Sequence, residues 1–188
     1  MASIKEKTKS PHSLEDLSAK DLSFNYWGTM NYLVGLIKSS ELKAGLILSF
    51  YGIIFNFVYQ NIDNAKEHFS TFGFIHIIII LWLISTLISM FYSIRSFIPR
   101  IEKNYEPNVF FFGDVISKFG TIKEYSNALL DTNIDKAKLY DQLGQQIYIN
   151  SKITAAKFKN VNKSLRYLAI SLGLLLLSII NYILGVIF

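Results

Sequence analysis

The residues best suited to chemistry form a basic stripe along a predicted helix in the C-terminal half of the chain. Lysine and arginine neutralise phosphate, an aromatic ring stacks on a base, and an amide side chain reads a base edge. The stripe therefore suits an anionic nucleotide, although the headgroup region of any membrane protein needs similar cations. At about 100° per residue, one narrow sector contains Lys138, Gln145, Tyr148, Lys152, Lys159, Lys163 and Arg166.

Further cations and aromatic residues lie closer to the apolar segments. Arg95 and Arg100 bracket a Phe-Ile-Pro sequence. With Lys43 and Arg166, these cations either surround a membrane-proximal pocket or anchor the chain to headgroups. Asn108 precedes a triple phenylalanine that is either a local core plug or an aromatic wall for a planar ligand. We expect Lys163 to lie nearer the headgroups and to contribute little to binding. The candidate ligand-binding residues are Lys43, Arg95, Arg100, Asn108, Phe111, Gln145, Tyr148, Lys152 and Lys159.

The sequence gives no indication of catalysis. It contains no cysteine, which excludes a thiolate nucleophile and thiolate metal ligands. His12, His68 and His76 fall in separate segments, so they form no plausible metal or acid–base site. No phosphate-binding glycine loop is present. We therefore expect no catalytic residues, no metal and no cofactor, and a protein that is not an enzyme.

Three apolar blocks must position these residues. They cover residues 44–59, 72–94 and 167–188, and none contains Asp, Glu, Lys or Arg. About 20 apolar residues cross a bilayer, so the last two blocks qualify and the first is short. A re-entrant or interfacial segment is the alternative for the first block. The fold class expected is an all-α integral membrane protein with about three transmembrane helices and a cytoplasmic helical region between the second and third.

We divide the chain into four regions. These are a tail with an amphipathic helix (1–40), a transmembrane hairpin (41–96), a cytoplasmic sensing region (97–164) and a third transmembrane helix (165–188). In the first region, apolar residues recur at helical spacing. This face either packs against the cytoplasmic helices, which we prefer because its polar side is not lysine-rich, or lies on the membrane. It comprises Leu22, Tyr26, Met30, Leu33 and Ile37.

The cytoplasmic region contains helix-start patterns. Thr121 with Glu124 and Thr132 with Asp135 both match the capping box, as does Ser13 with Asp16 near the N-terminus. They predict short helices over 109–119 and 122–130 and a long helix from Asn133. No proline follows Pro107, so the long helix is expected to continue directly into the third span.

The distribution of positive charge predicts the orientation. Of the nineteen Lys and Arg residues, six lie at or before Lys43, one lies between the first two blocks, and twelve lie from Arg95 to Arg166. This bias predicts a cytoplasmic N-terminus and an external C-terminus.

Several short sequences resemble the transmembrane effectors of Pycsar antiphage defence. They occur in the family's order relative to three spans, from Glu41 to Phe188. Glu41 stands where the family pattern usually has Asp, so the charge is kept. The matching sequences are Glu41-Leu42-Lys43-Ala44, Phe97-Ile98-Pro99-Arg100, Asn108-Val109-Phe110-Phe111-Phe112-Gly113, Gln146-Ile147-Tyr148, Ser151-Lys152-Ile153 and Lys157-Phe158.

The resemblance implies a ligand-activated effector of the bacterial inner membrane. In that family a nucleotide cyclase makes cyclic UMP or cyclic CMP on infection, and the effector then impairs the membrane. The expected partners are therefore a cyclic pyrimidine mononucleotide, membrane lipid, a functionally linked cyclase and further copies of the chain, with no nucleic acid. The alternative is a constitutive structural or accessory subunit of a membrane complex, in which the stripe only anchors the chain to lipid.

Overall fold

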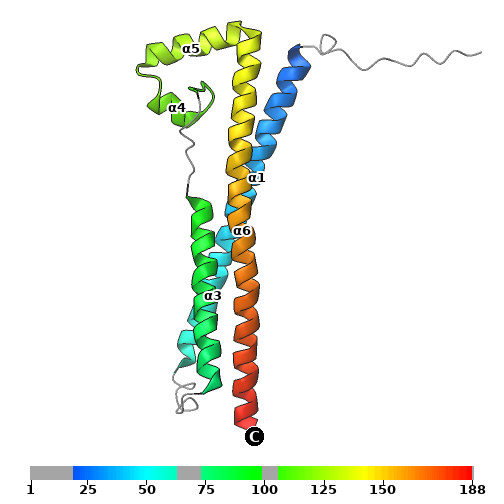
Figure 1. Ribbon diagram of the computed structural model, residues 1–188, viewed down its shortest axis with the longest axis vertical. Coiled ribbons are helices and arrows are strands. Elements are labelled where there is room, and N and C mark those ends of the chain that lie inside the picture. Colours follow the sequence, from blue (N-terminus) through cyan, green and yellow to red (C-terminus); the bar gives the residue numbers. More distant parts are fainter. Residues whose placement is uncertain (1–18, 63–72, 99–105, 188) are drawn as a thin grey trace, which may run out of the picture. The chain divides into compact units, whose positions relative to one another are not determined.

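The computed structural model describes residues 19–62, 73–98 and 106–187, and every regular element in this part of the chain is an α-helix (Figure 1). The expected all-α class is confirmed. Arg100, the Ser13–Asp16 pattern and two of the histidines, His12 and His68, lie outside the described residues. The elements are α1 (Ala19–Gln60), α3 (Phe74–Phe97), α4 (Phe112–Ser117), α5 (Ile122–Ile134) and α6 (Lys136–Ile187).

Three of these helices, α1, α3 and α6, are long and apolar enough to cross a membrane. A helix satisfies its own backbone hydrogen bonds, which is the condition for crossing hydrocarbon. The first apolar block, 44–59, lies within the 42-residue α1, so its shortness in sequence does not prevent it from spanning. The chain is therefore a multi-pass membrane protein.

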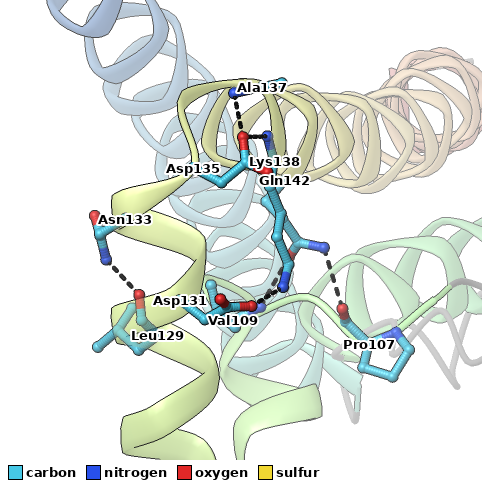
Figure 2. Close-up of polar contacts among 9 residues, drawn as sticks. All are labelled: Pro107, Val109, Leu129, Asp131, Asn133, Asp135, Ala137, Lys138 and Gln142. Atoms are coloured by element: carbon cyan, nitrogen blue, oxygen red, sulfur yellow. Dashed lines mark hydrogen bonds and ion pairs between the residues drawn. The ribbon is translucent and has the colours of Figure 1, made fainter.

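The helix ends agree with the capping predictions at one place and differ at another. At the start of α5, the Glu124 amide donates to the Thr121 hydroxyl and the Thr121 amide donates to the Glu124 carboxylate, as predicted. The Thr132 prediction is wrong, because Thr132 is buried inside α5. The long helix instead starts at Lys136, with Asp135 accepting from the Ala137 and Lys138 amides (Figure 2).

The two longest helices are continuous. The predicted amphipathic segment and the first span form one helix, α1, because no proline lies between Pro11 and Pro99. For the same reason α6 runs for 52 residues from Lys136 into the third apolar block, as expected. By contrast α4 is limited to six residues, shorter than the predicted 109–119.

The chain divides into two compact units, of which the first comprises Met1–Tyr32 and Glu106–Tyr148. In it, Tyr26 of α1 lies 5.7 Å from Tyr140 of α6 between ring centroids, so the preferred packing of the amphipathic segment is confirmed. Figure 2 shows Gln142 reaching the loop before α4, where it accepts from the Val109 amide and donates to the Pro107 carbonyl.

The second unit comprises Leu33–Tyr105 and Ile149–Phe188, and buried hydroxyl groups join two of its helices. The Ser89 hydroxyl of α3 donates to the Ser164 carbonyl of α6 at 2.8 Å, and the Ser164 hydroxyl returns a bond to the Ser89 carbonyl at 2.9 Å. The Ser93 hydroxyl lies 2.7 Å from that of Ser164. Small hydroxyl residues allow close helix approach in a membrane, where apolar side chains alone provide little driving force.

Candidate functional site

A buried lysine of α6 joins the three long helices of the second unit. The Lys157 ammonium donates to the Glu41 carboxylate of α1 at 2.8 Å and to the Ser96 carbonyl at the end of α3 at 2.5 Å. Lys157 is only 5% exposed. A buried ammonium is tolerated when a countercharge and further acceptors surround it. Lys157 therefore has a packing role that the sequence analysis did not assign to it.

Other side chains of α3 and α6 line an open cavity of about 400 Å³. Three of the side chains lining it, Arg95, Lys159 and Lys163, are cationic, and none is acidic. Like charges that converge on one cavity attract anions. The complete lining is Tyr92, Arg95, Ala155, Ala156, Lys159, Asn160 and Lys163.

Local contacts hold several of these groups in place. The Lys163 ammonium lies 4.9 Å from the centre of the Tyr92 ring and 3.4 Å from its hydroxyl. The Tyr92 ring also stacks on Tyr167, with centroids 6.2 Å apart and planes 12° apart. The Asn160 amide donates to the Arg95 carbonyl at 3.4 Å. The cavity thus combines an ordered aromatic ring, an amide and three cations.

The structure brings two of the candidate residues together, because Arg95 and Lys159 face the same cavity from different helices. Lys43 is exposed on α1, with its ammonium 5.6 Å from the centre of the Phe158 ring. Tyr148 and Lys152 are exposed on α6, outside the residues that line this cavity.

Other candidates have structural contacts within the first unit. Asn108 is fully buried and donates to the Gln142 carbonyl at 2.7 Å, while its own oxygen accepts from the Phe110 amide. Phe111 is 2% exposed, which matches a core plug and leaves no ring face open as a ligand wall. The Gln145 amide donates to Asp141 one turn earlier.

Sequence reasoning missed Tyr92 and Asn160 and assigned Lys163 to the headgroups. Tyr92 lies inside the apolar block 72–94, where its position gives no signal of a ligand site. Asn160 and Lys163 line the cavity only because α3 packs against α6, and the sequence contains no direct signal for that packing. The i, i+4 spacing of Lys159 and Lys163 was visible and was compatible with one shared site.

The cavity lining presents cations, a phenol and an amide, which suit an anionic ligand. It contains no carboxylate, imidazole or thiol. Within the described residues, no group of three or more His, Asp or Glu side chains is arranged to hold a metal ion.

A comparison with known protein families identifies a family for this chain. Residues 25–185, most of the chain, match the Pycsar effector protein domain, PycTM. Neither the curated proteins nor the solved structures gave a match. Members of this family are membrane-disrupting effectors rather than catalysts. The match covers all three apolar helices and the region between them, so the chain belongs to the Pycsar transmembrane effectors, which respond to a cyclic nucleotide in antiphage defence.

Proposed function

We propose that this effector binds cyclic UMP or cyclic CMP in the cavity between α3 and α6 and then impairs the integrity of the inner membrane. The observation that carries the proposal is the convergence of Arg95, Lys159 and Lys163 on one cavity that also presents Tyr92. A volume of about 400 Å³ lies within the usual range of small-ligand sites. A cyclic mononucleotide has an anionic phosphate and a planar base, which match these two kinds of side chain.

Different side chains of the cavity suit different parts of the ligand. Arg95 has a planar guanidinium that can contact two phosphate oxygens at once, whereas Lys159 and Lys163 act as point charges. The Tyr92 ring, which already contacts Tyr167 and the Lys163 ammonium, offers its remaining surface to the base. Asn160, which already donates to the Arg95 carbonyl, carries an amide oxygen that can accept a hydrogen bond from the base edge.

Ligand binding at this position would act on helix packing. Arg95 and Ser96 form the end of α3, and their carbonyls accept hydrogen bonds from Asn160 and Lys157 of α6. A phosphate that draws the Arg95 side chain toward Lys159 would alter how the end of α3 packs against α6. A ligand shifts such an equilibrium only through different affinities for the two packings. We propose that the liganded packing is the one that damages the membrane.

We also propose that the N-terminus and the cavity face the cytoplasm, because twelve of the nineteen Lys and Arg residues lie from Arg95 to Arg166. A single cysteine at Asn127 should then resist an impermeant thiol reagent in intact spheroplasts, whereas one at Asn64 should react. Labelling at Asn127 alone would reverse the orientation.

Calorimetric titration of the detergent-purified chain tests the ligand. We expect binding of cyclic UMP or cyclic CMP and much weaker binding of cyclic AMP and cyclic GMP. Loss of one charge-assisted contact is worth about 1.5 to 3 kcal/mol, so Arg95→Ala should weaken binding roughly tenfold or more. Lys123→Ala removes a charge from the exposed side of α5 and should leave the affinity unchanged. Failure of all four nucleotides to bind the wild-type chain would favour the constitutive accessory subunit instead.

A further inference from the structure

One side of α6 is apolar and is not covered by the rest of the described chain. We call it the outer face of α6: Ile170, Gly173, Leu177, Ile180 and Leu184. These residues are separated by three, four, three and four positions, which is the heptad spacing of a helix that packs along a partner helix. The four Leu and Ile side chains are each about half exposed, from 50% to 54%. A side chain at Gly173 would meet no atom within 4 Å.

The opposite side of α6 makes the contacts within the chain. Ser164 and Ser171 on that side are buried, and they bond to Ser89 of α3 and Tyr51 of α1. Even so, only 6% of the most apolar 18-residue stretch of α6 is buried within the chain, compared with 22% for α1 and 33% for α3. Thus the apolar stretch of α6 is the least buried of the three.

Exposure of Leu and Ile to lipid has no cost, but exposure of an amide does. Asn181 lies beside the outer face and is exposed, and its side chain makes no hydrogen bond to another residue that the structure describes. It follows Arg166 by fifteen residues, which corresponds to about 22 Å along the helix. With Arg166 at one boundary, this depth is still inside a hydrocarbon core of about 30 Å. An unpaired amide there is unfavourable, so Asn181 requires a polar partner at the same depth.

We infer that the outer face of α6 binds the same face of a second copy of this chain. Copies inserted with one topology place their Asn181 side chains at the same depth, and an amide can donate to and accept from an identical amide. Gly173 allows the two backbones to approach closely, and the flanking Leu and Ile residues interdigitate at heptad spacing. Another protein would need a matching polar group at that same depth, which a second copy provides by symmetry.

This self-association requires no nucleotide, so it stands or falls separately from the proposed ligand site. It places the contact between copies in the third span. The cavity with Lys159 and Lys163 lies further toward the N-terminus of the same helix.

Disulfide cross-linking of the full chain in native membranes tests the interface. The chain contains no cysteine, so single substitutions report without background. Leu177→Cys lies on the outer face, and Leu176→Cys is its matched control. These neighbours differ by about 100° around the helix but have similar exposure, 54% and 59%. We expect Leu177→Cys to form a dimer at least about tenfold more efficiently. Equal cross-linking at both positions, or none at Leu177→Cys, would overturn the interface, and a cross-link to a different protein would overturn the second copy as its partner.

The role of Asn181 is tested by sedimentation of the full chain in detergent. Asn181→Leu inserts at least as well as the wild type, because it only adds apolar surface. Interhelical hydrogen bonds in membranes are modest, so we expect this variant to self-associate about three- to tenfold more weakly. Asn181→Gln keeps the amide and should retain most of the association. If the Asn181→Leu chain associates as strongly as wild type, the amide does not contribute to the interface.

Discussion

Two lysines that lie two residues apart on α6 have opposite environments. Lys157 is buried and bonded to Glu41 and the Ser96 carbonyl, whereas Lys159 is exposed on the wall of a cavity lined by two further cations. At 100° per residue they point about 200° apart. The Lys157 charge joins three helices through its bonds to α1 and α3, whereas the Lys159 ammonium is accessible to an anion from solvent. The same residue type thus serves packing on one side of the helix and, in the proposed function, ligand binding on the other.

The largest effect should follow removal of the buried charge. Lys157→Met keeps the apolar stem but leaves the Glu41 carboxylate and the Ser96 carbonyl without their partner. Breaking a buried pair costs about 3 to 5 kcal/mol, and Glu41 is 36% exposed, so we expect a loss near the lower limit. Chemical unfolding of the detergent-purified chain measures this change.

An exchange of the two charges sharpens the test. The double variant Glu41→Lys with Lys157→Glu restores the ion pair, but glutamate cannot donate to the Ser96 carbonyl. We therefore expect it to recover only part of the stability lost in the single variants. If Lys157→Met unfolds at the same denaturant concentration as wild type, the distinction between the two lysines fails.

A smaller effect, of a different kind, is expected from Lys159→Met. The side chain is exposed, so the free energy of unfolding should change by less than about 0.5 kcal/mol. The affinity for the cyclic pyrimidine nucleotide should fall about tenfold, because one charged contact to phosphate is lost. Lys136→Met, at the exposed start of α6, is the control and should change neither quantity. An unchanged affinity in Lys159→Met would exclude its direct contact with the ligand.

The smallest effect concerns the hydroxyl contacts between α3 and α6. Ser164→Ala removes the bond to the Ser89 carbonyl and the contact with Ser93. Interhelical hydrogen bonds of this kind average about 0.6 kcal/mol in membranes, and the alanine still fits the close approach. We expect a slight loss of stability in the unfolding assay with normal nucleotide affinity. A loss as large as that of Lys157→Met would show that the hydroxyl contacts, rather than the ion pair, hold the helices together.

The sequence was informative wherever a local rule decides the outcome. The absence of proline after Pro107 predicted the continuity of α6, and the Thr121–Glu124 pattern predicted the start of α5, because both depend on neighbouring residues. The Thr132–Asp135 prediction failed because α5 continues through Thr132 to Ile134, and α6 starts only at Lys136. Asp135 ends α5, and its carboxylate caps the start of α6, whereas Thr132 is buried inside α5.

The candidate site was predicted only in part because it depends on which helices pack together. Arg95 and Lys159 were chosen for their charge, and the structure places both at one cavity. Lys157 lies outside the sector of the basic stripe, and its burial is explained only by the position of Glu41 on α1. Asn108 and Phe111 were chosen for their unusual sequence, and both are buried in contacts of the first unit.

Membrane potential in growing cells tests the central claim most directly. The full chain is expressed with an active or an inactivated cyclase that makes cyclic UMP or cyclic CMP, and a voltage-sensitive dye reports depolarisation. We predict rapid depolarisation of wild-type cells only with the active cyclase, and none when an Arg95→Ala and Lys159→Ala double variant reaches the membrane in equal amount. Equal depolarisation with the active and the inactivated cyclase would contradict activation by a cyclic nucleotide.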